Sequence, residues 1–228
     1  LSNVTISGNT AGIHGGGIFN DGGTVSLLNV TVASNAADSV TDDADDGEGG
    51  GIHNAAGDLS FKNTIVTGNS DPTSDPDCFG NLSSGGHNLV QQISPGCNIV
   101  GDTAGNITGQ DPLLGPLTDN GGPTQTHAIP ANSPAVDAGS ADCPGPATDQ
   151  RGIIRPLDGD GDGPAACDIG AFELGPSGTP TPTPAPTPGG GIQGDTDCDT
   201  DVDSVDSLKV LRHVAGLTLV VDHLHVVA

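Results

Sequence analysis

Residues 15–20 read Gly-Gly-Gly-Ile-Phe-Asn, residues 49–54 repeat this stretch as Gly-Gly-Gly-Ile-His-Asn, and residues 85–88 repeat part of it as Gly-Gly-His-Asn. Each copy ends in an asparagine, and each asparagine lies 34 positions after the one before it. Self-similarity at a fixed spacing of this size is typical of a solenoid, whose repeats stack on one another. We therefore expect residues 1–100 to form a repeat array.

Short β-branched runs lie between the glycine stretches, and they are Val4-Thr5-Ile6, Val30-Thr31-Val32 and Thr64-Ile65-Val66. Glycine and asparagine bound each run, which is the usual pattern of a strand between turns. One such unit cannot bury an apolar face alone, whereas stacked units share a continuous core. These features predict an all-β fold, and a parallel β-helix (solenoid) fits them best.

Asparagines recur at equivalent places in the repeats and are expected to stack in columns. At a corner, asparagine tolerates the left-handed backbone conformation, and stacked side-chain amides can hydrogen-bond as a ladder. The glycine triplets supply positive φ or let neighbouring backbone approach closely. Asn3, Asn29 and Asn63 form one aligned set. The two predicted structural ladders are Asn20, Asn54 and Asn88, and Asn9, Asn35 and Asn69.

Two groups of ionisable residues in the array allow either a structural or a metal-binding interpretation. The offset of 34 relates His53 to His87 and places Phe19 in the same column, where we favour stacked flat side chains over a metal pair. The acidic segment 38–48 interrupts the second unit. A solvated loop is favoured there, with a weak cation site as the alternative.

The composition supports the repeat array and excludes some partners. The chain has only four Phe and no Trp, Tyr or Met, so Val, Ile, Leu and Ala must fill its core. A formal net charge of −24 argues against binding of nucleic acid or anionic membrane surfaces and favours bound cations. No apolar run is long enough for a membrane span. Leu1 opens inside a repeat, so we expect further sequence upstream.

Four of the five cysteines are expected to form two disulfides. By proximity along the chain we pair Cys78 with Cys97 and Cys143 with Cys167, and each loop closure is worth about 3 kcal/mol in the chain-entropy model. Cysteines in such loop-like sequence favour an oxidising, extracellular location over a reduced cytosolic one. Cys198 is left without a partner within the chain.

The second half of the chain contains a specific series of short motifs. They read Asp-Pro-Leu-Leu-Gly-Pro-Leu at 111–117, Asn-Gly-Gly-Pro-Thr-Gln-Thr-His at 120–127, Asn-Ser-Pro-Ala-Val-Asp-Ala-Gly at 132–139, Asp-Gln-Arg-Gly at 149–152 and Cys-Asp-Ile-Gly-Ala-Phe-Glu at 167–173. This series resembles the C-terminal part of the choice-of-anchor Q family of secreted β-helix proteins, and the repeats resemble those of polymorphic outer-membrane proteins. The resemblance covers residues 1–174. It implies a right-handed parallel β-helix, an extracellular or cell-surface location and no assigned catalytic residues.

Residues 101–174 are expected to supply the last rungs and the cap that a solenoid needs at its end. The charges expected to pair within this cap are Asp149, Arg151, Arg155, Asp168 and Glu173. The alternating acids Asp158, Asp160 and Asp162 could wrap Ca²⁺, although the twelfth position of that loop is Ile169 rather than an acid. A solvated turn is the alternative.

A linker and a small module are expected after the cap. Residues 175–191 form the linker, and proline alternates with Thr or Ala over 179–188, which favours a semi-rigid polyproline II spacer. Residues 192–217 contain a Ca²⁺-loop pattern followed by a helix, and its ligands would be Asp195, Asp197, Asp199, Asp203 and Asp206, with Asp201 offering its carbonyl. This module resembles a type I dockerin repeat, which implies Ca²⁺ binding and docking onto a cohesin. It departs from that family by having Thr200 where glycine is expected and a single repeat instead of two. Residues 218–228 are an apolar tail strand suited to β-augmentation.

Two functions follow from these features. The first is a secreted, non-enzymatic structural or adhesive protein with Ca²⁺-stabilised acidic loops, which self-assembles head-to-tail into filaments or through its tail strand. Its partners would be further copies, a polysaccharide or a cohesin-like receptor. The alternative is a carbohydrate-active β-helix enzyme, a polysaccharide lyase or hydrolase, with a dockerin-like module. A lyase needs a cationic cleft for uronates, and the repeat array offers only Lys62, whereas hydrolysis by paired carboxylates stays open.

Overall fold

The structure, a computed structural model, describes residues 1–37, 47–72, 75–161 and 163–176. All of them lie in one compact unit, Leu1–Thr183. They form strands and no helix, and none of them therefore belongs to a helix that could span a membrane. Several predictions fall outside the described residues: Asp162, most of the acidic segment 38–48, most of the linker, the Ca²⁺ loop with Cys198 and the helix after it, and the tail strand.

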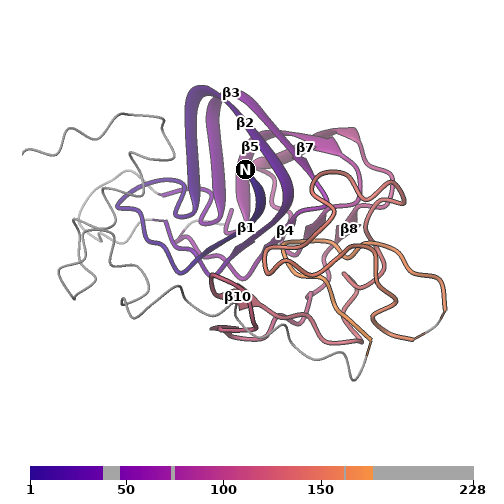
Figure 1. The fold of residues 1–228 in the computed structure, drawn as a ribbon. Coiled ribbons are helices and arrows are strands. Elements are labelled where there is room, and N and C mark those ends of the chain that lie inside the picture. Colours follow the sequence, from indigo (N-terminus) through magenta and orange to yellow (C-terminus); the bar gives the residue numbers. More distant parts are fainter. Residues whose placement is uncertain (38–46, 73–74, 162, 177–228) are drawn as a thin grey trace, which may run out of the picture. The chain divides into compact units, whose positions relative to one another are not determined.

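Eight strands form one parallel sheet that curls on itself (Figure 1). The chain passes through this sheet in successive rungs, which we number in chain order. Rung 1 is β1 (Ser2–Ser7), rung 2 is β2 (Ile18–Ala33), rung 3 is β3 (Ile52–Lys62) and β4 (Ile65–Thr67), rung 4 is β5 (Cys78–Gly85) and β6 (Leu89–Val90), and rung 5 is β7 (Cys97–Asp102) and β8 (Ile107–Thr108). The strand order β7-β5-β3-β2-β4-β6-β8 follows because the long β2 bends: its first half pairs with β3 and its second half with β1 and β4.

The number of residues per rung is not constant. Val4 pairs with Val30, 26 positions on, and Thr31 pairs with Ile65, 34 positions on. Ile65 then pairs with Leu89 after 24 positions. The offset of 34 therefore relates rung 2 to rung 3 but fails between rungs 3 and 4, because the connecting segments there are shorter.

This change in rung length corrects the predicted ladder of Asn20, Asn54 and Asn88. Asn20 and Asn54 are in register, and Asn20 Nδ2 donates to Asn54 Oδ1 at 2.7 Å. Asn54, however, lies opposite Gly80 in β5 rather than Asn88. Asn88 precedes β6 and accepts the Thr64 backbone N–H at 3.0 Å. The expectation for Asn88 is therefore wrong.

The expected column of Phe19, His53 and His87 is wrong for the same reason. The register places Phe19 beside His53 and His53 beside Phe79. His87 instead continues a corner column whose members share a left-handed backbone, with φ of 52° at Asn3, 53° at Asn29, 48° at Asn63 and 55° at His87. Asparagine suits such corners because its short polar side chain tolerates this conformation.

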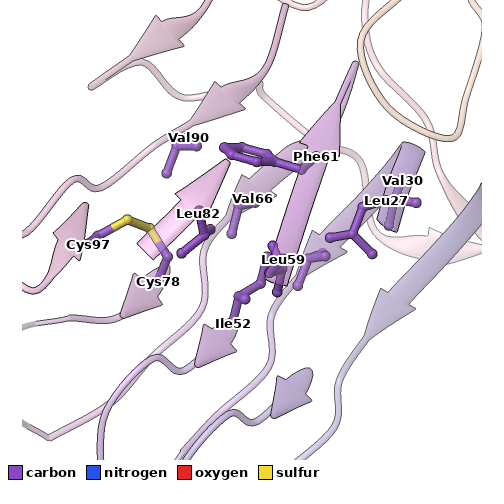
Figure 2. Close-up of a cluster of buried hydrophobic side chains, with 11 residues drawn as sticks. Leu27, Val30, Ile52, Leu59, Phe61, Val66, Cys78, Leu82, Val90 and Cys97 are labelled. Carbon is purple, nitrogen blue, oxygen red and sulfur yellow. A yellow bond between two sulfur atoms is a disulfide. The ribbon is translucent and has the colours of Figure 1, made fainter. Parts of the chain in front are cut away.

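The inside of the curl is filled mainly by aliphatic side chains, as the composition predicts. Figure 2 shows this cluster, and its fully buried members include Leu27, Ile52, Leu59, Phe61 and Leu82. Burying each such side chain contributes about 1.5–3 kcal/mol. The disulfide Cys78–Cys97 joins rungs 4 and 5 within the cluster, and Cys143–Cys167 forms elsewhere in the chain.

The chain beyond rung 5 packs along the side of the sheet. It contains the antiparallel pair β9 (Leu117–Thr118) and β10 (Thr126–His127) and otherwise irregular backbone. Its hydrogen bonds reach rung 1 (Asn3 to the Thr148 carbonyl) and the corner that follows β5 in rung 4 (His87 to the Ala138 carbonyl). A second apolar cluster fills this junction, with Ile65, Leu89, Ile129, Ala135, Ile169 and Phe172 buried. The segment 117–174, which we call the lateral segment, therefore covers one side of the rungs and does not cap an end as expected.

Candidate functional site

A groove crosses the rungs at the ends of β1, β2 and β4 and just after β6. Ser7, Ala33 and Thr67 are partners in neighbouring strands, and Gln91 directly follows the last residue of β6. A hollow of about 570 Å³ lies between these positions and the segment from Asp111 to Leu117. The groove is therefore built from equivalent positions of four rungs on one wall and from residues 111–117 with His127 on the other.

A serine and a histidine meet in this groove. Ser7 Oγ lies 2.8 Å from His127 Nε2, and His127 Nδ1 lies 2.7 Å from the Gly115 carbonyl oxygen. A carbonyl oxygen only accepts, so Nδ1 carries the proton and Nε2 accepts the Ser7 hydroxyl. A hydroxyl, a neutral imidazole and a group that orients the imidazole are the parts of an activated nucleophile. The same contacts also fasten the lateral segment to rung 1.

The ladder of Asn9, Asn35 and Asn69 is present and ends on a carboxylate. Asn9 Nδ2 donates to Asn35 Oδ1 at 2.9 Å, and Asn35 Nδ2 donates to Asn69 Oδ1 at 3.0 Å. Asn69 Nδ2 donates in turn to Asp77 Oδ1 at 2.9 Å. Asp77 is fully buried, and its other oxygen accepts the Gln92 N–H at 2.8 Å. Burial raises the pKa of Asp77 to about 6, against the opposing effect of these hydrogen bonds.

The lateral segment brings together the charges that the sequence grouped. Arg151 Nη2 lies 2.8 Å from Asp149 Oδ2, and Arg155 Nη1 lies 2.9 Å from Glu173 Oε2. Both pairs are almost completely shielded from solvent. The guanidinium of Arg151 also lies over the Phe172 ring, 3.4 Å from its centroid. Removing one partner of such a buried pair is strongly destabilising, because it leaves an uncompensated buried charge.

The buried ion-pair cluster of Asp149, Arg151, Arg155, Asp168 and Glu173, which we call the knot, also binds the backbone. Its carboxylates accept hydrogen bonds from backbone N–H groups. Asp168 accepts the Asp137 N–H at 2.8 Å and the Leu174 N–H at 2.5 Å, and Glu173 accepts the Leu157 N–H at 2.8 Å. Burial, followed by the negative charge of Glu173, raises the pKa of Asp168 to about 8. Burial likewise raises the pKa of Glu173.

An acidic turn gathers two of the three predicted Ca²⁺ ligands with one unexpected partner. Carboxylate oxygens of Asp137, Asp158 and Asp160 lie within 4.8 Å of one another. Asp158 accepts the N–H groups of Gly161 and Gly163, which wraps the backbone around it. Asp137 Oδ2 is buried and accepts no hydrogen bond from the residues that the structure describes. This donor set suits a hard cation with oxygen ligands.

Sequence reasoning missed Ser7, Asp77, Asp137 and His127, and only their long-range partners reveal them. Ser7 and His127 are 120 positions apart, so no local motif marks the pair. Comparisons with protein-family models, with curated proteins and with solved structures found no match. The function is therefore inferred from the geometry of the described residues.

Proposed function

We propose that the curled parallel sheet is a right-handed parallel β-helix and that the chain is an extracellular structural or adhesive protein. The observation that carries this proposal is the position of the most perturbed acids. Strongly shifted carboxylates often mark catalytic clefts. Asp77, Asp168 and Glu173 instead lie outside the groove and accept backbone N–H groups, so their burial serves the fold.

The cationic side chains of the described residues argue in the same direction. Lys62 pairs with Asp142 at 3.5 Å, and Arg151 and Arg155 are committed to the buried knot. A polysaccharide lyase holds uronates with free cations, and none of the groove's described lining residues is a lysine or arginine. The two disulfides are typical of proteins outside the cytoplasm, which agrees with an extracellular role.

Head-to-tail assembly is supported by the two ends of the sheet. Among the described residues, β1 pairs only with β2, and a further strand, from upstream sequence or from another copy, would pair with its other edge. At rung 5 a hollow of about 490 Å³ is lined in part by Ile93 and Ile99, and Ile93 is 45% exposed. A contact between these two different ends is heterologous, and it extends copies into a filament when it does not close.

Sedimentation and electron microscopy of the purified chain test assembly. We expect oligomers that grow with protein concentration, and we expect Ile93→Asp to return the protein to monomers. Ile154→Asp is the matched control, because Ile154 is 63% exposed and lies in the lateral segment. Monomers of the parent at every concentration, or equal assembly by both variants, would refute head-to-tail contact.

We further propose that Ca²⁺ binds the acidic turn and the loop that begins at Asp195. A ligand present at one hundred times its dissociation constant stabilises the folded state by about 2.7 kcal/mol. Calcium should therefore raise the melting temperature, and Asp160→Asn should remove most of the part due to the turn. Asp195→Asn separates the contribution of the C-terminal loop. If Ca²⁺ does not change the melting temperature of the parent, both proposed sites are ruled out.

Ser7 and His127 favour one second candidate, hydrolysis of an acylated polysaccharide. The 2.8 Å contact lies in an open groove that crosses four rungs, which suits a chain-like substrate. Release of acetate from acetylated glycans would support it if Ser7→Ala abolished the release. Equal rates of acetate release by the parent and Ser7→Ala would show that the Ser7–His127 hydrogen bond only joins rung 1 to the lateral segment.

A further inference from the structure

The residue just before the glycine triplet is a histidine in one repeat and a glutamate in the next, and the two residues stack. His14 and Glu48 are 34 positions apart, as are the glycines that follow them, Gly15 and Gly49. Two contacts fix this stacking: the Gly15 N–H donates to the Glu48 carbonyl at 3.2 Å, and the Glu48 N–H donates to His14 Nδ1 at 3.2 Å. The segments that enter rungs 2 and 3 therefore hold His14 and Glu48 side by side.

His53 completes the group from β3. Its ring centroid lies 4.6 Å from that of His14, and its Nδ1 lies 3.1 Å from the Glu48 carbonyl oxygen. The carbonyl can only accept, so Nδ1 carries the proton and Nε2 keeps its lone pair. Metal-binding histidines are oriented in this way, by donating the other ring N–H to a carbonyl. His53 is 4% exposed and is held between Phe19 and Phe79, so its ring has little freedom.

We propose that His14, Glu48 and His53 bind one divalent transition-metal ion, with zinc as the closest chemical fit. One donor atom from each side chain lies within 4.8 Å of the other two. Two imidazoles and a carboxylate suit zinc and its neighbours in the series, whereas Ca²⁺ requires oxygen ligands throughout. His14 and Glu48 are both partly exposed, which leaves a side open for ion entry and for water as a further ligand.

The electrostatics of the site favour a cation. His53 is buried beside His14 and Glu48, and its Nε2 is left as the ligand atom because Nδ1 donates to the Glu48 carbonyl. Glu48 supplies a negative charge beside it, and the chain as a whole carries −24. Binding has one structural cost: a neutral imidazole has a single acceptor nitrogen, so the metal replaces the 3.2 Å bond from the Glu48 N–H to His14.

The ion would clamp the entry of rung 2 to the entry of rung 3. His14 precedes β2, while Glu48 and His53 lie on either side of the second glycine triplet. The site shares no residue with the groove or with either proposed Ca²⁺ site, so it neither requires nor supports the proposed function.

Zinc titration of the full chain tests the site, with His213, His223 and His225 replaced by alanine to remove the imidazoles after the linker. We expect one zinc ion per chain, and Co²⁺ should give the visible absorption of a nitrogen- and oxygen-bound ion. His53→Phe keeps an aromatic ring in the column of Phe19 and Phe79, and Glu48→Gln keeps size and polarity. Each should weaken zinc binding by about tenfold or more.

His87→Asn is the matched control, because asparagine occupies the same corner at Asn3, Asn29 and Asn63. This variant should bind zinc as the parent does. Zinc should also raise the melting temperature of the parent and of His87→Asn but not that of His53→Phe, which shows that each protein tested is folded. Absence of zinc binding by the parent, or equal binding by His53→Phe, would overturn the proposal.

Discussion

Replacing Asn35 by alanine cuts the amide ladder at its middle. The side chain is 1% exposed and makes four hydrogen bonds. Its Oδ1 accepts the backbone N–H of Asn9 at 3.0 Å and Asn9 Nδ2 at 2.9 Å. Its Nδ2 donates to Asn69 Oδ1 and to the Ile6 carbonyl, each at 3.0 Å. Alanine removes all four and adds nothing in their place.

The expected cost follows from which partners are left without a bond. Asn69 Oδ1 keeps the backbone N–H of residue 35 at 2.9 Å, and water can reach the exposed Asn9 side chain. The Ile6 carbonyl and the Asn9 backbone N–H lose the partner that Asn35 supplied, and an unmet group costs about 1–3 kcal/mol. We expect a loss of about 2–4 kcal/mol, or roughly 10 °C in melting temperature. Asn9→Ala removes only the outer end of the ladder and should cost under about 1 kcal/mol.

Urea unfolding followed by far-ultraviolet circular dichroism measures both variants, since the chain has no Trp or Tyr for fluorescence. The comparison is internal, because the two asparagines are chemically identical and differ in position along the ladder. If Asn35→Ala loses no more stability than Asn9→Ala, the ladder does not stabilise the stack and the reasoning fails.

Three further predictions concern the glycines, a buried acid and the knot. An added Cβ at Gly51 would lie 2.6 Å from the Asp77 carbonyl oxygen, so Gly51→Ala should reduce the free energy of unfolding by about 3 kcal/mol. At Gly68 an added Cβ would meet nothing within 4 Å, and only the φ of 61° opposes it, so Gly68→Ala should cost about 1 kcal/mol. Urea unfolding measures both values. The pKa of Asp77 is raised to about 6, so the stability that it contributes is present below about pH 4 and lost as the pH rises through about 6. Asp77→Asn should therefore make the melting temperature depend less on pH over that range, and an unchanged pH dependence would contradict the prediction. Arg155→Lys keeps the charge near Glu173 but cannot reproduce the three guanidinium hydrogen bonds at 2.7–2.9 Å, so the free energy of unfolding should fall by about 3 kcal/mol. A stability equal to that of the parent would show that the charge alone is sufficient.

The all-β class could be predicted from the sequence because the signals for strands and turns are local. The β-branched runs became strands, and the offset of 34 gave the register between rungs 2 and 3. The later register could not be predicted from that offset. The Gly-Gly-His-Asn stretch at 85–88 looks like a repeat, yet Gly80 occupies the place opposite Asn54. Changes of loop length between rungs shift register without leaving a pattern in the strands themselves.

The candidate sites show the same division between local and distant information. The disulfide partners and the charges of the knot lie close together in sequence, and their grouping was predicted. Ser7 meets His127 only because the lateral segment returns to rung 1, and Asp137 joins Asp158 only through the fold of that segment. The expectation of an end cap concealed the contact of Ser7 with His127, since it placed residues 101–174 away from the first rung.

The lateral segment also determines how the rungs come apart. In a stack where each rung contacts only its neighbours, the outermost rung is held by a single interface and frays first. Here the segment that bonds to Asn3 in rung 1 also bonds to His87 in rung 4. Peeling off the first rung therefore disturbs residues that hold the fourth. A one-dimensional stack is turned in this way into a single cooperative unit, whose rungs are lost together.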